Sequence, residues 1–241
     1  MENAHIVKSF DQDLAQIEAL ILEMGGMVEN QIMLAIKALI SRDEELAKSV
    51  RAADKAIDTV EAQVDELALR ILALRQPMAS DLRAVVCAMK VSSNLERIGD
   101  YAKNIAKRTV TLKDTTSVGS SEKTLKRMGE LVQRMIQDAL NAYVAKDLAM
   151  VDELIARDEE VDHMHNTLFR ELLTYMMEDP RHITSCMHLL FIAKNIERMG
   201  DHTTAVAEQI HYVVTGEMPE EDRPKSDLTS QMVVEVDSNG K

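Results

Sequence analysis

An internal repeat is the feature that most constrains the fold of this chain of 241 residues. The motif NLERIGD at residues 94–100 returns as NIERMGD at residues 195–201. Four further pairs of matching residues keep a constant separation of 104 positions: Gly25 and Gly129, Asp43 and Asp147, Asp54 and Asp158, Asp58 and Asp162. Beyond Pro77 and Pro180 the separation falls to 101, so the second copy has a shorter turn there. A register kept over this length indicates that one structural unit was duplicated.

Each copy has the sequence pattern of three helices. Apolar residues recur at steps of three and four, which places them along one face of a helix. Aromatic residues make up only 3% of the chain and Trp is absent, a composition that disfavours strands. We expect helices near the following positions, with prolines ending the second helix of each copy: 5–40, 44–77, 80–112, 122–145, 147–178 and 181–214.

The predicted fold class is all-α, with two tandem antiparallel three-helix bundles related by the internal duplication. The first bundle spans residues 5–112 and the second spans residues 122–215. Between them, residues 113–121 (KDTTSVGSS) are polar and lack periodicity, as is typical of a linker. Residues 216–241 hold two prolines and many charged residues, so we predict a mobile C-terminal tail.

The composition also excludes several classes of function. A formal net charge of −13 argues against a nucleic-acid-binding surface, which needs a continuous basic face, and favours cationic partners. No stretch approaches the roughly 20 apolar residues of a membrane span, and the N-terminus lacks the pattern of a secretion signal. Cys87 and Cys186 do not have the spacing of a zinc site. We therefore expect a cytoplasmic protein with buried free thiols.

Carboxylates form the most informative pattern. Four acidic pairs, each with its members four residues apart on a predicted helix, occur at matching places in the two copies: Asp54 with Asp58, Glu96 with Asp100, Asp158 with Asp162, and Glu197 with Asp201. Like charges at this spacing destabilise an isolated helix by about 0.2–0.5 kcal/mol for each pair, so a compensating cation is needed. Because the second and third helices of a bundle are antiparallel neighbours, we predict one polycarboxylate site per bundle for Mg, Mn, Fe or Zn.

Histidine adds a nitrogen donor to the second copy only. His165 occupies the place of Glu61, one turn beyond the Asp pair, and both are weaker candidates for metal ligands. Glu160 and His163 form a single Glu-x-x-His motif of the kind found in ferritin-like di-iron bundles. Residues 56–59 do not repeat that motif, which argues against a di-iron oxidase.

A structural alternative remains open, because acidic residues beside a core stripe often form only a solvated face. Arg97 and Arg198 lie inside the two motifs and would neutralise part of the charge. Repetition at matching positions favours cation binding instead. No Gly-rich phosphate loop, Ser/His/Asp arrangement or activated Cys is present, so no catalytic residue is expected.

The sequence resembles the PhoU family of phosphate-specific transport system accessory proteins from about residue 5 to 215. The resemblance is carried by LERIGDYA at 95–102 and by IERMGDH at 196–202, which are similar to the doubled (Glu/Asp)-x-x-x-Asp signature of the family. It implies two three-helix bundles that bind multinuclear clusters of iron, zinc or manganese. Those roles fall on the following residues, the last four with less support: Glu96, Asp100, Glu197, Asp201, Asp54, Asp58, Asp158 and Asp162. Asn104 follows the first motif, and Ala205 stands at its place in the second.

The resemblance also implies a function. The family negatively regulates phosphate-starvation genes and phosphate uptake, and it links a phosphate ABC transporter, through its ATPase, to a sensor histidine kinase. A homodimer that meets the membrane only through these partners is expected. Two alternatives remain: a metal-storage bundle or carboxylate metalloenzyme, and a scaffold whose carboxylates bind nothing.

Overall fold

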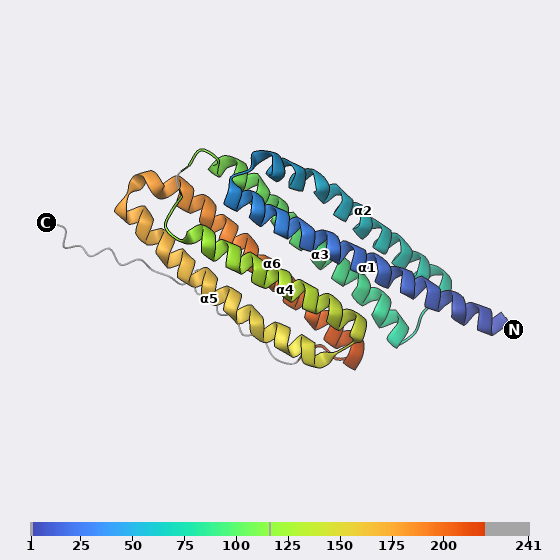
Figure 1. Cartoon of the computed structure of the whole chain (residues 1–241). Helices are drawn as coiled ribbons and strands as arrows, with labels where there is room; N and C mark the ends of the chain where they lie inside the picture. The colour runs from blue at the N-terminus through green and yellow to red at the C-terminus, as the bar shows by residue number, and fades with distance from the viewer. Residues whose placement is uncertain (1, 116, 220–241) are drawn as a thin grey trace.

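Long antiparallel helices build the whole described part of the molecule (Figure 1). The structure is a computed structural model that describes residues 2–115 and 117–219, with side chains from Phe10 onward. The helices have these bounds: α1 Glu2–Ser41, α2 Glu44–Arg75, α3 Ser80–Leu112, α4 Ser121–Ala145, α5 Leu148–Glu178 and α6 Ile183–Thr215. The predicted all-α fold of two three-helix bundles, α1 to α3 and α4 to α6, is confirmed.

The duplicated turns between the first two helices of each bundle have the same local geometry. Arg42 and Lys146 adopt left-handed backbone angles, with φ of 54° and 53°, and end the preceding helices. Asp43 and Asp147 then cap the next helix, since the Asp43 carboxylate accepts the N–H of Leu46 and the Asp147 carboxylate accepts two backbone N–H groups. An N-cap carboxylate satisfies amides that have no partner within the helix. The sequence repeat therefore includes the residues that form and cap this turn in each copy.

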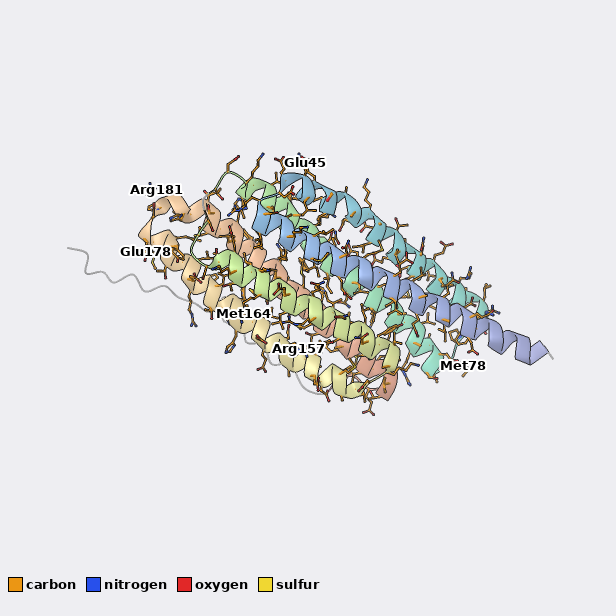
Figure 2. All side chains as sticks on the ribbon, viewed as in Figure 1. Glu45, Met78, Arg157, Met164, Glu178 and Arg181 are labelled. Carbon is orange, nitrogen blue, oxygen red and sulfur yellow. The ribbon has the colours of Figure 1, made fainter. Side chains whose placement is uncertain are left out.

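The second turn differs between the copies, as the change in register predicted. After α2, Gln76 takes a left-handed conformation, and Ala79, which also has a positive φ of 50°, precedes α3. After α5, a 3₁₀ turn at Pro180–His182 precedes α6, which begins at Ile183 rather than at 181. The cause is Asp179, whose carboxylate accepts the N–H of Arg181 and holds the tighter turn. These two turns lie at opposite ends of the molecule, as the places of Met78 and Arg181 in Figure 2 show.

Each bundle presents a glycine to the other bundle. A Cβ on Gly25 of α1 would lie 2.4 Å from Leu140 of α4, and a Cβ on Gly129 of α4 would lie 2.7 Å from Ile36 of α1. These two contacts are reciprocal, because Gly129 matches Gly25 and Leu140 matches Ile36 in the repeat. The antiparallel helices α1 and α4 thus approach closely around a pseudo-twofold axis (Figure 1).

The same axis passes between α3 and α6, where matching residues meet. The rings of Tyr101 and His202, which occupy equivalent positions, have centroids 5.6 Å apart. His202 Nδ1 donates to Asn94 Oδ1 at 2.8 Å. The outer helices α2 and α5 lie on opposite sides of this central layer (Figure 1). The first acidic pair of each copy is therefore on an outer helix, and the second is on a central one.

The prediction that no stretch reaches the apolarity of a membrane span is wrong for α1. By length and composition alone, Phe10–Ser41 is long and apolar enough to cross a membrane, and its most apolar stretch has a mean hydropathy of 1.3. Within the protein, 44% of that stretch is buried. The reason is that α1 packs against α2, α3 and α4, so it carries apolar residues around much of its circumference. Such a pattern is also typical of the core helix of a soluble bundle.

The connections outside the helices match the predicted layout in part. The segment after α3 joins the bundles as expected, and its Val118 is buried in the core. Arg42 fastens this connection, because its guanidinium donates to the carbonyl of Leu112 and pairs with Glu122. Both cysteines are free and buried, as predicted. Of the predicted tail, residues 220–241 lie outside the described residues.

Candidate functional site: two carboxylate clusters

In the first bundle, Lys103 joins the two acidic helices. Its ammonium donates to Asp54 Oδ2 on α2 and, at 2.9 Å, to Asp100 Oδ1 on α3. Asp54 is buried, with 3% of its surface exposed, and its Oδ1 accepts from Gln31 Nε2 of α1 at 3.1 Å. Both oxygens of the Asp54 carboxylate therefore have donors, as a buried charge requires. The three helices of the bundle meet at this one carboxylate.

The remaining carboxylates of the first bundle crowd together on the outer side of α2 and α3. The pKa of Glu96 rises to about 7, because burial disfavours its charge and because Asp100 and Glu61 repel it. The pKa of Glu61 is also raised, first by burial and then by Asp65 and Asp58. Arg97 opposes this rise only weakly, since its Nε lies 3.9 Å from Glu96 Oε2. Acidic residues of α2 and α3 thus lie close enough to repel one another, and the polycarboxylate metal site expected from them stays a prediction.

In the second bundle the corresponding residues are more deeply buried. The α5 residues of the cluster each have 5% or less of their surface exposed: Asp158, Asp162 and His165. Glu197 on α6 is 4% exposed, and Asp201 is partly exposed. Lys194 approaches from one turn earlier on α6, with its Nζ 2.8 Å from Glu197 Oε1. Burial of this many ionisable groups is costly unless each is paired or coordinated.

Gly200 explains how α5 and α6 can approach at this cluster. A Cβ at that position would lie 2.6 Å from Asp158 Oδ1, closer than any carbon and oxygen can approach without a shift. The missing side chain therefore makes room for a carboxylate rather than for a neighbouring backbone. At the matching Gly99, a Cβ would lie 3.1 Å from both Gln31 Oε1 and Ile57 Cδ1, which is tight but less severe.

The two groups that satisfy Asp54 have no counterpart in the second bundle. The residue at the place of Lys103 is Thr204, whose hydroxyl donates to the carbonyl of Gly200 at 2.9 Å. The residue at the place of Gln31 is Met135, which is fully buried. Sequence reasoning overlooked both Lys103 and Gln31. Two features of the sequence could have indicated their roles: Lys103 follows Asp100 by three residues, and Gln31 is a polar residue within the apolar stripe of α1.

The donor chemistry of the second bundle suits a transition metal. Its cluster combines carboxylate oxygens with the His165 imidazole, the mixed set that Zn, Fe and Mn accept. Asn166 is also buried there, in the place of Ala62. Within residues 2–115 and 117–219, no group of three or more His, Cys, Asp or Glu side chains is already placed to hold a metal ion. The residue types therefore fit a metal, and their side chains are not drawn together around one point.

Other residues considered in the sequence do not join these clusters. Asp58, which matches the buried Asp162, is exposed at the edge of the first cluster, where its charge helps to raise the pKa of Glu61. Glu160 and His163 are exposed on α5, so the single Glu-x-x-His motif faces solvent. Asn104 is exposed as well, and Ala205 is partly buried at the matching position.

Comparison with known proteins identifies the family. The PhoU domain model matches residues 21–109 and again residues 125–210, so both repeats are recognised separately. This chain belongs to the PhoU family. It is 48% identical over 227 residues to the phosphate-specific transport system accessory protein PhoU homolog of Caulobacter vibrioides, covering 94% of this chain and 99% of that protein.

Two solved structures of PhoU proteins share the fold. The crystal structure of PhoU from Pseudomonas aeruginosa has a TM-score of 0.83 and 39% identity, and the match covers 86% of this chain and all of that one. The phosphate transport system regulatory protein PhoU from Streptococcus pneumoniae has a TM-score of 0.82 and 31% identity, with coverage of 88% and 100%. The PhoU resemblance expected from the doubled acidic motif is thereby confirmed.

Proposed function

We propose that this PhoU-family chain is a negative regulator of phosphate uptake and of the phosphate-starvation regulon. In this role it couples the ATPase of a phosphate ABC transporter to a sensor histidine kinase. The observation that carries the proposal is the match of both repeats to PhoU, together with relatives described as accessory and regulatory proteins of phosphate transport. The nearly complete coverage of the Caulobacter relative supports a transfer of function across the whole chain.

This function needs contact surfaces rather than catalysis. In the described residues the ionisable groups with strongly raised or lowered pKa values sit in ion pairs or in the acidic cluster, apart from Tyr143, whose pKa is raised mainly by burial. None of these groups is a nucleophile held by a base. We therefore propose a protein without enzymatic activity, which acts in the cytoplasm as a homodimer and reaches the membrane through the transporter.

A metal ion is part of the proposal for the second bundle. Its ligands would come from the following residues of α5 and α6: Asp158, Asp162, His165, Glu197 and Asp201. A bound divalent or trivalent ion such as Fe, Zn, Mn or Mg, alone or in a multinuclear cluster, would neutralise these carboxylates. The buried positions of four of these residues and the space left by Gly200 support this assignment. Such a site would fasten the outer helix α5 to the central layer.

A deletion strain tests the regulatory proposal. Loss of this chain should derepress alkaline phosphatase and phosphate uptake in phosphate-rich medium, and the wild-type chain supplied in trans should restore repression. As a matched control, Glu159→Gln changes an exposed acid of α5 outside the cluster and should complement fully. Normal repression in the deletion strain would contradict the proposal. Elemental analysis after purification without chelators tests the metal assignment separately.

A further inference from the structure

We propose that a small cavity at the end of the second bundle binds a guanidinium group, supplied by an arginine side chain of a partner protein. The cavity has a volume of about 110 Å³ and lies at the end of the molecule where α4 and α6 end, between these helices, α1 and the start of α3 (Figure 1). Its polar lining comes from Glu18 of α1, Tyr143 of α4 and Lys146 directly after α4, and the rest is apolar. In the first bundle the matching place is filled by an arginine of this chain.

Arg42 is the arginine that fills the matching place. Its guanidinium donates to the backbone carbonyl of Leu112 and pairs with the Glu122 carboxylate. It also donates to Thr115 Oγ1 at 3.2 Å, and only 19% of the Arg42 side chain is exposed. A guanidinium is planar and carries five N–H donors, so it can bond a carbonyl and a carboxylate at the same time. These contacts join the ends of α1 and α3 to the start of α4.

The internal repeat places a carboxylate at the same point of the second bundle but no guanidinium. Glu18 matches Glu122, with the separation of 104 positions that the repeat keeps. The residue at the place of Arg42 is Lys146, whose side chain is exposed. Among the residues that the structure describes, neither Glu18 nor Lys146 forms an ion pair. Within that part of the chain, Glu18 thus lacks the partner that Glu122 has.

The surroundings of Glu18 suit a guanidinium better than an ammonium. Val213, the counterpart of Leu112, lines the cavity in the last turn of α6, where helix carbonyls have no partner within the helix. The pKa of Tyr143 is raised, first by burial and then by the charge of Glu18, so the carboxylate lies near a hydroxyl shielded from water. Charged hydrogen bonds strengthen where water is excluded. A guanidinium fork reaches both kinds of acceptor at once, whereas an ammonium is a point charge.

The size of the cavity and the charge of the chain indicate the source of the guanidinium. A volume of 110 Å³ is about four times the ~30 Å³ that one water molecule occupies in the liquid, so it holds the four heavy atoms of a guanidinium and little more. The stem and backbone of an arginine must then stay outside, as they do when a side chain of a docked protein enters a pocket. The net charge of −13 attracts a basic segment.

Replacement of Lys146 tests whether a guanidinium fits the cavity of the full-length chain. Lys146→Arg gives the second bundle the cation of the first, so we expect its thermal midpoint to rise by about 2–4 °C. Addition of Glu18→Gln should remove that gain, because the carboxylate is the expected partner. Lys107→Arg, which changes an exposed lysine of α3, is the control and should leave the midpoint unchanged. No rise in Lys146→Arg, or a rise that survives Glu18→Gln, would overturn the proposal.

Titration with a blocked arginine tests binding from outside the chain. N-acetyl-arginine methylamide, N-acetyl-lysine methylamide and free arginine would each be added to the wild type and followed by NMR of the methyl groups around the cavity. We expect millimolar binding of the blocked arginine, which becomes weaker by about tenfold in Glu18→Gln and in Lys146→Arg. Blocked lysine should bind more weakly. Arg42→Lys copies the second repeat and should open a second site for the blocked arginine beside Glu122.

The outcomes separate the site from its source. No binding of the blocked arginine, or binding that Glu18→Gln leaves unchanged, would overturn the proposal. Free arginine should bind more weakly than the blocked form, because its own carboxylate is repelled by an acidic chain. Tighter binding of free arginine would support a guanidinium site and refute an arginine side chain of a partner as its source. None of these results depends on a metal ion or on repression by phosphate.

Discussion

The two bundles share their helices, their turns and their acidic motif, and they differ in how the acid is neutralised. In the first, Lys103 and Gln31 hold Asp54, while Glu96 keeps 19% of its side chain exposed. In the second, Lys194 of α6 pairs with Glu197, which keeps only 5% of its side chain exposed, and Thr204 stands at the place of Lys103. A duplicated scaffold thus conserves backbone geometry more strictly than charge compensation, so that two copies of one motif need not bind the same cation.

The largest difference between the bundles is expected from their motif glycines. Gly200→Ala should lower the free energy of unfolding by about 1–3 kcal/mol, because its Cβ would overlap Asp158 in a packed contact. Gly99→Ala should change it by about 1 kcal/mol or less, since the gain in helix propensity offsets a milder contact with Ile57 and Gln31. Urea unfolding of the two variants measures the contrast. Equal losses of unfolding free energy would show that the two helix contacts need a glycine to the same degree.

A smaller effect is expected from protonation of Glu96. Its folded pKa of about 7 lies above its ordinary value of 4.5, so this group favours the folded state below pH 4.5 and loses that contribution as the pH rises through 7. Glu96→Gln should therefore stabilise the metal-free protein at pH 8 by about 1 kcal/mol, after allowance for solvent screening, and have little effect at pH 4. Chemical unfolding at both pH values checks the sign. A variant that is less stable at pH 8 would refute the account of crowding around Glu96.

A comparable test exchanges the residues beside the first Asp of each repeat. Gln31→Met copies the second bundle and removes one donor from the buried Asp54 carboxylate, so we expect a loss of about 1 kcal/mol. Met135→Gln makes the reverse change in the second bundle and should place an amide near Asp158. Calorimetry of both variants with and without Mn²⁺ measures whether the amide competes with a metal. No loss in Gln31→Met would mean that Asp54 does not need this donor.

The smallest difference is expected at the N-caps, where the bundles are alike. Asp43→Ala and Asp147→Ala should each cost about 1 kcal/mol, because each removes a carboxylate that accepts backbone N–H groups at the start of a helix. Thermal unfolding of the two variants side by side tests the equivalence. A much larger loss for one cap would show that the duplicated turns have diverged in stability as well as in sequence.

Much of the fold followed from the sequence, because periodicity, prolines and turn residues are local signals. The expected ends of α3 at 80 and 112 agree with the structure, and α2 ends at Arg75, just before Pro77. The tighter turn at Pro180–His182 was predicted as a shift in register, although its 3₁₀ geometry was not. What stayed hidden was the contact between bundles. An apolar stripe shows which face of a helix is buried, and it does not show that Gly25 receives Leu140 from a helix of the other repeat.

The sequence predicted where the acidic clusters lie, but it did not predict which side chains neutralise their carboxylates. Spacing of four residues placed the carboxylates on common faces, and the antiparallel arrangement of α2 and α3 brought them together. Lys103 and Asp54 are 49 residues apart, so their contact depends on how α3 is rotated against α2. The exposure of Asp58 and the burial of Asp162 depend on the same packing detail. Only the side-chain geometry separates the two otherwise similar motifs.

Crystals of the wild-type protein grown with Mn²⁺ and measured at a wavelength with anomalous scattering from manganese test the difference between the bundles most directly. We expect an anomalous peak between α5 and α6, next to Asp158 and Glu197, and none between α2 and α3, where Lys103 should stay bonded to Asp54. A peak of equal height between α2 and α3, with Lys103 displaced from Asp54, would contradict this difference between the bundles.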